Sequence, residues 1–203
     1  MVRPYRRGGA LARLLSDRYP SPARALAELE VLRELQVRGV PVVAPVAAVA
    51  RRRGAFWRLR LCTERLVDGR TLPQFLADFP SARRRAVEAV GAAVRLAFDA
   101  GLRHPDLHVD NVLCQPRGDE VHAVLVDLDR ARIDGPLSAR AREEMLARMQ
   151  RYVEKHRDRL PAVLSRADVM RFLRSLGTER GARHELWRRL ARRLAQRRTL
   201  LRK

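Results

Sequence analysis

Apolar positions early in the chain predict a helix over residues 22–38. Pro22 suits the first turn of a helix, and Gly39 is typical of the position just past a helix end. Residues at helical spacing give this segment an apolar face: Leu26, Leu29, Leu32 and either Leu35 or Gln36.

Residues 40–66 (VPVVAPVAAVARRRGAFWRLRLCTERL) predict strands around a turn at Arg51–Gly54. Polar and apolar residues alternate in FWRLRLCTE, which is the period of a half-buried strand. The loop VDGRT then separates these strands from a short helix that begins near Leu72.

Two helical regions are predicted further along. Residues 81–100 form an amphipathic helix, with Ser81 as its N-cap and Gly101 just past its end. From Ser138 onward the arginine-rich sequence predicts several short helices. The breaks between them are expected near three residues: Pro161, Gly177 and Gly181.

A β-hairpin is predicted between these helical regions, with residues 112–115 pairing with 121–126 across the turn PRGDE. The order of elements is therefore helix, strands, helix, hairpin and helices. This order predicts an α+β fold, with a small strand-bearing part and a mainly helical part.

Composition and charge narrow the class of protein. With 203 residues, 46% of them hydrophobic and 33% charged, the chain is long and apolar enough for a globular core. The net charge of +20 favours an anionic partner, such as nucleic acid, a membrane surface or a phosphorylated substrate. Only Lys155 and Lys203 are lysines. Such a skew to arginine is also typical of a genome-wide codon bias, so charge does not choose among these partners.

The sequence predicts an intracellular protein without a membrane span. Cys62 and Cys114 lie far apart in strand-like settings and are expected to be buried, reduced thiols. The first residues, MVRPYRRGG, lack the apolar run of a signal peptide. The longest apolar stretch, 40–50, is too short to cross a bilayer, and two prolines interrupt it.

Three oxygen-bearing side chains converge if the hairpin forms. Asn111 precedes its first strand and Asp127 follows its second. Because paired strands run roughly 4.8 Å apart, we expect these two side chains at one edge. Asp106 lies on the loop that enters the same edge.

Carboxylate and amide oxygens suit Mg²⁺, which completes its shell with water and phosphate. A separate aspartate beside such a site can accept the proton of an attacking hydroxyl, which is the arrangement used in phosphoryl transfer. The pattern H-x-D-L-x-x-x-N occurs here as His104, Asp106, Leu107 and Asn111, followed by Asp127 in VLVDLD. Taken singly, these residues are also common in turns, and His104 could be structural. The joint pattern favours a kinase.

The chain resembles the lipopolysaccharide kinase family, which includes 3-deoxy-D-manno-octulosonic acid (Kdo) kinases and core heptose kinases. The matching segments are VRPYRRGG (2–9), AELEVLRELQVRGVPVVAPVA (27–47), TERLVDGRTL (63–72), HPDLHVDNVL (104–113) and VLVDLDRAR (124–132). The resemblance implies a protein-kinase-like fold. It divides the chain into a truncated N-terminal lobe (1–66) of strands and a helix, and a mainly helical C-terminal lobe (67–203) with the catalytic loop and hairpin.

The resemblance also implies roles for individual residues. Asp106 is expected to be the catalytic base, with Asn111 and Asp127 as catalytic residues that bind Mg²⁺. His104 is expected to support the loop. The expected nucleotide-binding residues are Arg3 at the phosphates, Glu28 as the glutamate of the small-lobe helix, and Thr63, Glu64 and Leu66 in the hinge that faces adenine.

The implied cofactors are ATP and Mg²⁺, and the implied reaction phosphorylates Kdo or heptose on lipid A–core. The protein would then work at the cytoplasmic face of the bacterial inner membrane, as a peripheral protein without a nucleic-acid partner. HPDLHVDN is also similar to the H-x-D-L-H-x-x-N of aminoglycoside and choline phosphotransferases. A third alternative is an inactive kinase fold that acts as a basic binding module.

Two departures from the family pattern bear on these alternatives. No lysine precedes Lys155, so arginine replaces the phosphate-binding lysine of protein kinases. The matching strand begins at Val2, so the glycine-rich loop that should cover the phosphates is expected to be missing. Either the start codon is misplaced or half of the nucleotide clamp is lost. Gly8 and Gly9 follow that strand and are expected to form a turn.

The last segment, 182–203, combines an apolar stripe with many arginines. It is consistent with a helix docked on the core, with a helix on an anionic membrane surface, or with a nucleic-acid patch, although it lacks a recognition motif for the last. The stripe consists of four residues: Leu186, Trp187, Leu190 and Leu194.

Overall fold

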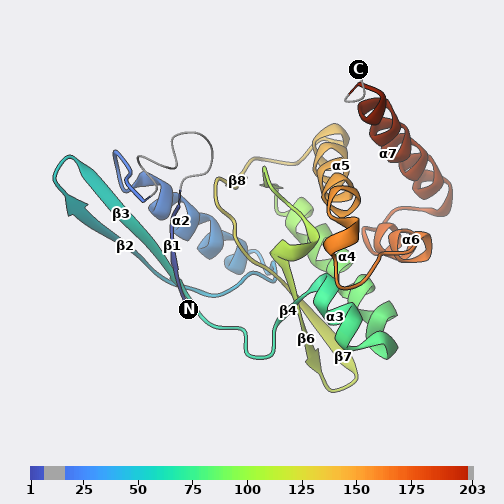
Figure 1. The fold of residues 1–203 in the computed structure, drawn as a ribbon, viewed down its shortest axis with the longest axis horizontal. Coiled ribbons are helices and arrows are strands. Elements are labelled where there is room, and N and C mark those ends of the chain that lie inside the picture. Colours follow the sequence, from blue (N-terminus) through green and yellow to red (C-terminus); the bar gives the residue numbers. More distant parts are fainter. Residues whose placement is uncertain (7–16, 201–203) are drawn as a thin grey trace.

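The computed structural model describes residues 1–6 and 17–200. A strand-rich part and a helical part lie side by side (Figure 1), in agreement with the predicted α+β class. Gly8 and Gly9, predicted to form a turn, lie outside the described residues. In the described ranges no helix is long and apolar enough to cross a membrane.

In residues 1–6 and 17–66 the strand-rich part is an antiparallel sheet of order β1-β3-β2 with the helix α2 beside it. Its elements are β1 (Val2–Pro4), α2 (Ala23–Val37), β2 (Pro45–Arg53) and β3 (Phe56–Thr63). Three of the predicted leucines of α2 are buried, but Leu26 is 46% exposed. Residues three apart drift around a helix by about 60° per step, so a run of four cannot share one narrow face. Glu28 occupies a buried position instead, at 2% exposure.

A short segment after α2 ties this part to the hairpin. The Leu125 N–H donates to the Pro41 carbonyl at 2.8 Å, and the Val43 N–H donates to the Leu125 carbonyl at 3.0 Å. Val42 therefore runs parallel to the hairpin strand at Leu125. This pairing holds α2 near the open end of the hairpin.

Within residues 67–200 the helical part contains the predicted hairpin and five helices. Its strands are β4 (Arg70–Thr71), β5 (Leu102–Arg103), β6 (Val112–Arg117), β7 (Glu120–Leu125) and β8 (Arg132–Ile133). Its helices are α3 (Leu72–Asp78), α4 (Arg83–Asp99), α5 (Ala139–Lys155), α6 (Arg166–Ser175) and α7 (Arg180–Leu200), with 3₁₀ turns at Pro80–Ala82, Val109–Asn111 and Arg157–Arg159. The sheet order is β4-β6-β7, and β5 pairs with β8.

Two predicted helix boundaries are wrong. Ser81 does not cap α4, because Pro80 starts a 3₁₀ turn that contains Ser81, and the helix begins at Arg83 with Ala82 as its N-cap. Gly181 does not separate helices, because it lies in the first turn of α7.

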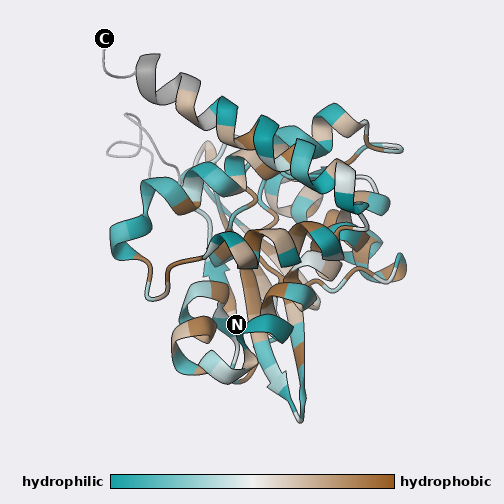
Figure 2. Cartoon of the chain, turned by 90° about the vertical axis from the view of Figure 1, so that its right-hand side faces the viewer, coloured by the Kyte–Doolittle hydropathy of each residue, from teal (hydrophilic) through white to brown (hydrophobic). Residues whose placement is uncertain are grey.

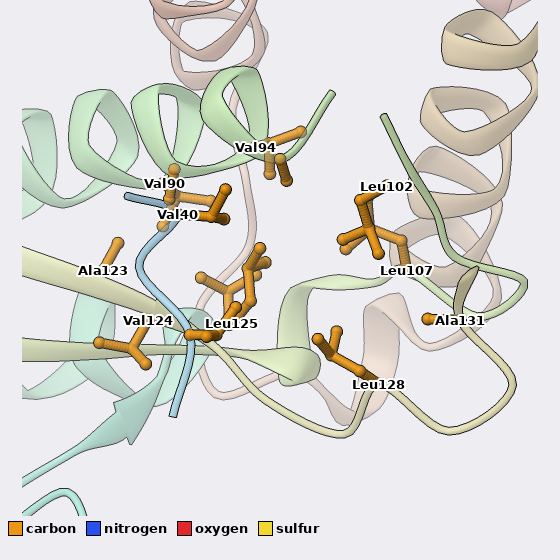
Figure 3. Close-up of a cluster of buried hydrophobic side chains, with 14 of the residues drawn as sticks. Val40, Val90, Val94, Leu102, Leu107, Ala123, Val124, Leu125, Leu128 and Ala131 are labelled. Atoms are coloured by element: carbon orange, nitrogen blue, oxygen red, sulfur yellow. The ribbon is translucent and has the colours of Figure 1, made fainter. Parts of the chain in front are cut away.

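The core of the helical part forms where α4 crosses the hairpin. Figure 3 shows Val90 and Val94 of α4 facing side chains of β7 and of the loops around the hairpin. Leu125 and Leu128 are fully buried there, one on each side of Asp127 in sequence. The outer faces of the helices are mostly hydrophilic (Figure 2). This packing fixes the backbone on both sides of the candidate site.

Gly101 and Cys114 behave as predicted, whereas Cys62 is only half-buried because it lies on β3 in a sheet that is covered incompletely. Gly101 ends α4 with a φ of +81°, and a Cβ there would lie 2.1 Å from the Asp134 carbonyl, so only glycine fits. Cys62 and Cys114 are both free thiols. Burial raises the pKa of Cys114 to about 12.

Candidate functional site

The hairpin brings Asn111 and Asp127 to the same end. Val112 pairs with Leu125 in the β6–β7 register, and the Val126 N–H donates to the Asn111 carbonyl at 2.9 Å. Asp127 follows with a φ of 55°, a left-handed conformation that is uncommon for a residue with a side chain. The convergence predicted from spacing is therefore present in the backbone.

The loop that carries Asp106 is fixed by hydrogen bonds to its backbone. Nδ2 of Asn111 donates to the Asp106 carbonyl at 2.9 Å, and the Asp106 N–H donates to Nδ1 of His104 at 3.1 Å. The Asp106 side chain itself is 82% exposed. Within residues 1–6 and 17–200 the amide oxygen of Asn111 accepts no hydrogen bond, so it remains available to a ligand.

His104 supports this loop as a neutral ring. Burial lowers the pKa of His104 to about 4, and the charges of Asp127 and Asp106 oppose this shift only in part. Because Nδ1 accepts the Asp106 N–H, the ring proton is assigned to Nε2. The side chain of His104 is buried beneath the loop, since the residue is only 1% exposed.

Arg3 on β1 joins the strand-rich part to the hairpin end. Its Nη2 contacts both carboxylate oxygens of Glu28, at 2.5 and 2.7 Å. Its Nη1 contacts Oδ1 of Asp127 at 2.8 Å. One guanidinium thus connects a helix of the strand-rich part with the residue that follows the hairpin.

One guanidinium faces two carboxylates in this cluster. Burial raises the pKa of Glu28, and the hydroxyl of Tyr5 and the charge of Arg3 offset that rise only in part. Burial acts to lower the pKa of Arg3, but the carboxylates of Glu28 and Asp127 outweigh it and raise this pKa. Burial and the hydrogen bond to Glu28 also raise the pKa of Tyr5. Arg3 and Tyr5 therefore hold the Glu28 carboxylate from two sides.

A second ion pair links α2 to the same segment. Nε of Arg24 donates to Oδ1 of Asp129 at 2.7 Å, and its Nη2 contacts Oδ2. The hydrogen bond that Arg24 donates to Asp129 is the main cause of a raised pKa for Arg24. The guanidinium also lies over the rings of Tyr5 and Tyr19, 5.7 and 5.4 Å from their centroids.

In the segment after β3 only some of the backbone groups form hydrogen bonds within the described chain. Both backbone groups of Thr63 pair with Met1, and the Glu64 N–H donates to the Ala44 carbonyl at 2.8 Å. The Glu64 carbonyl and the Leu66 N–H have no hydrogen-bond partner in the described part of the chain. Of the three predicted hinge residues, Glu64 and Leu66 can therefore offer backbone groups to a ligand, whereas Thr63 cannot.

Sequence reasoning missed three contributors to the site. Tyr5 lies two residues after Arg3 and donates to Glu28, which the two-residue period of a strand could have indicated. Arg24 lies one helical turn before Glu28, which the helical period could have indicated. Tyr152 of α5 donates to Oδ2 of Asp110, in the loop that also carries Asp106, at 2.5 Å, and no local sequence signal predicts this contact.

Comparisons with known proteins relate the chain to one family. A family model described as "Lipopolysaccharide kinase (Kdo/WaaP) family" matches residues 1–175. The 3-deoxy-D-manno-octulosonic acid kinase of Xanthomonas oryzae pv. oryzae (strain PXO99A) is 37% identical over 163 residues. The kinase of the same name from Xylella fastidiosa (strain M12) is 34% identical over 161 residues. Both matches cover 77% of this chain and 62% of the relative.

A solved structure described as "WaaP in complex with acyl carrier protein" is similar to this chain with a TM-score of 0.64 and 26% identity. The match covers 85% of this chain and 76% of that chain. The protein-kinase-like fold predicted from the sequence is thus confirmed. Since the family model extends from β1 through α6, the chain belongs to the lipopolysaccharide kinase (Kdo/WaaP) family.

Proposed function

We propose that this protein transfers the γ-phosphoryl group of ATP to a hydroxyl of a lipopolysaccharide core sugar, Kdo or heptose, on lipid A–core. The observation that carries the proposal is the contact of Arg3 with both Glu28 and Asp127. It is supported by the names of the relatives, 3-deoxy-D-manno-octulosonic acid kinases. The chain spans 62% of the length of these relatives.

The nucleotide would lie between residues 1–66 and 67–203, which we propose as the two lobes. Arg3 would contact the phosphates, because a guanidinium presents several N–H groups to phosphate oxygens. Glu28 would hold that guanidinium in place. The Glu64 carbonyl and the Leu66 N–H would pair with adenine, since both are without a partner in the described chain.

The oxygens at the hairpin end fit Mg²⁺. Among the described residues no cluster of three or more His, Cys, Asp or Glu side chains could hold a metal. Mg²⁺ bound with ATP needs only one or two protein ligands, because phosphates and water complete its shell. Asp127 and the free amide oxygen of Asn111 would hold the ion, which when bound would neutralise charge on the phosphates.

Asp106 would act as the base. Its exposed carboxylate can accept the proton of the acceptor hydroxyl while that oxygen bonds to the γ-phosphorus and the bond to the ADP oxygen breaks. The backbone bonds to His104 and Asn111 orient the loop without using the carboxylate.

A transfer assay with several acceptors tests the proposal. The protein would be incubated with [γ-³²P]ATP, Mg²⁺ and a Kdo-bearing lipid A precursor, with choline and an aminoglycoside as competing acceptors. Label on the glycolipid supports the proposal. Label only on choline or the aminoglycoside would support kinase activity but reject the lipopolysaccharide core sugar as its substrate. Absence of transfer and of ATP binding would favour the binding-module alternative.

We further propose that the protein contacts the anionic cytoplasmic face of the inner membrane through α7. The apolar stripe of this helix is not available, since Leu186 and Leu190 are buried and Trp187 packs against the core; the side chain of Leu194 lies outside the described ones. The contact would therefore be electrostatic, through exposed arginines such as Arg188 and Arg192.

A further inference from the structure

A cavity of about 250 Å³ lies beside the catalytic loop, on the side where His104 and Pro105 form its wall. It is lined by α5, by that loop and by the segment after Asp127. Four arginines and one glutamate give the lining a net charge of +3: Arg103, Arg130, Arg132, Arg148 and Glu144. Sequence reasoning assigned no role to these arginines.

The arginines of this cavity are incompletely neutralised. Arg103 and Arg132 are direct partners in the β5–β8 register, and like charges opposite each other in a sheet are destabilising. Arg132 contacts Asp134 at 2.8 Å. The contacts of Arg103 are long, 3.9 Å to Asp134 and 3.8 Å to Glu144.

The other two arginines have unused donors. Arg130 forms no hydrogen bond or ion pair with any residue in the described ranges, and it is held at a φ of 59°. Arg148 donates from Nη1 to the Pro105 carbonyl at 2.6 Å. This bond places the guanidinium one residue from Asp106. An anion in the cavity would meet N–H donors from several directions and would relieve the repulsion between Arg103 and Arg132.

We propose that this cavity binds an anionic group of the acceptor, so that the hydroxyl to be phosphorylated lies beside Asp106. This inference rests on the proposed function and names the acceptor's recognition chemistry. The names of the relatives state that their substrate is an acid, which carries a carboxylate at neutral pH. The group is that carboxylate or a phosphate of the lipid portion, because arginine recognises both through paired N–H donors.

Steady-state kinetics with matched acceptors test the proposal. Arg130→Gln and Arg132→Gln each remove one charge from the cavity, and Arg85→Gln removes one from an exposed site on α4 as the control. We expect the cavity variants to raise the acceptor KM by about 10- to 100-fold, the loss typical of a hydrogen bond to a charged group. The KM for ATP should not change, and Arg85→Gln should behave as the parent protein.

Altered acceptors identify the anion. If the carboxylate binds in the cavity, an acceptor whose carboxylate is converted to a carboxamide should show the raised KM with the parent protein, and Arg130→Gln should add no further loss. If a phosphate binds there, the dephosphorylated acceptor should instead show the raised KM with the parent protein, with no further loss in Arg130→Gln. The proposal would be overturned if the variants raised the KM by the same factor for every acceptor, or raised it for none.

Equilibrium binding separates this inference from the proposed function. Titration of the parent protein with free 3-deoxy-D-manno-octulosonic acid and with inorganic phosphate should give a saturable signal that Arg130→Gln weakens and Arg85→Gln does not. Such binding without any phosphoryl transfer would support anion binding in the cavity and reject the proposed kinase activity. Normal transfer with an unchanged acceptor KM in both variants would support the kinase activity and reject anion binding in the cavity.

Discussion

The guanidinium of Arg3 contacts the carboxylate of Asp127 at 2.8 Å. The first residue lies on the edge strand β1, and the second follows the hairpin in the helical part. The same guanidinium holds Glu28, so it serves two carboxylates from different parts of the fold. A nucleotide that binds here would offer phosphates to the guanidinium, and the Asp127 carboxylate would then be released toward Mg²⁺.

We predict that Arg3→Gln destabilises the protein by roughly 1–3 kcal/mol, because it leaves the buried Glu28 carboxylate without its cation. Urea unfolding measures the loss. Adding Glu28→Gln should recover part of it, since the uncompensated charge is removed. Arg3→Lys should lose less stability but still bind ATP more weakly, because one ammonium cannot reproduce the paired donors of a guanidinium. A double variant no more stable than Arg3→Gln would contradict the role given to Glu28.

The two aspartates of the site should differ in kinetics. Asp106→Asn should lower kcat by about 10²- to 10⁴-fold with KM for ATP unchanged, as expected for a base that acts in the transition state. Its melting temperature should stay near that of the parent, because the side chain is 82% exposed. Asp127→Asn should instead raise the Mg²⁺ concentration needed for half-maximal rate. Full activity of Asp106→Asn in an active parent would exclude Asp106 as the base.

The Arg24–Asp129 pair should couple α2 to the segment after the hairpin. A double-mutant cycle with Arg24→Gln and Asp129→Asn is expected to give a coupling free energy within roughly 0.5–3 kcal/mol, the range for residues in direct contact. The exposed pair of Glu34 on α2 and Arg38 just past its end is the control, for which roughly 0.3–0.5 kcal/mol is typical. Equal coupling in the two cycles would show that the inter-part pair adds no more than a surface ion pair.

Protonation of His104 should make stability depend on pH. Burial lowers its pKa from 6.5 to about 4. Between these two pH values the unfolded chain binds the proton and the folded protein does not. The contribution of neutral His104 to the free energy of unfolding is therefore fully present above pH 6.5, and it is lost as the pH falls toward 4. Its full size is about 3 kcal/mol.

Urea unfolding at several pH values tests this, with His104→Gln as the comparison. The stability difference between parent and variant should shrink as the pH falls from 7 to 4.5. Because burial also lowers the pKa values of His108 and His122, the parent curve alone does not isolate His104. A difference that stays constant with pH would show that His104 is not buried in its neutral form.

Membrane contact through α7 should depend on charge alone. Sedimentation with liposomes that contain anionic lipid should pellet the parent protein, and the pelleted fraction should fall as salt rises. Arg188→Gln with Arg192→Gln should weaken pelleting without unfolding the protein, because both side chains are exposed. Arg189 is a less suitable target, since it pairs with Glu143. Equal pelleting of parent and variant would contradict contact through this face.

The sequence by itself determined the local parts of the site. Spacing alone predicts that Asn111 and Asp127 meet, because a tight turn leaves a hairpin few other pairings. The resemblance to the family named Arg3 and Glu28, but no local period connects them with Asp127. Their meeting requires β1 to pair with β3, and α2 to be held against the hairpin through Pro41 and Leu125.

Only the tertiary structure decided which residues of the same type come together in space. The chain has 43 lysines and arginines, and their sequence pattern gives no reason to group Arg103, Arg130, Arg132 and Arg148. They share a cavity because β5 pairs with β8 and α5 packs beside the loop that carries Asp106. Likewise the stripe on α7 fits a membrane or a core equally well by period, and the burial of Leu186 and Leu190 assigns it to the core. Short-range periodicity records which face of an element is apolar, whereas long-range packing decides what that face meets.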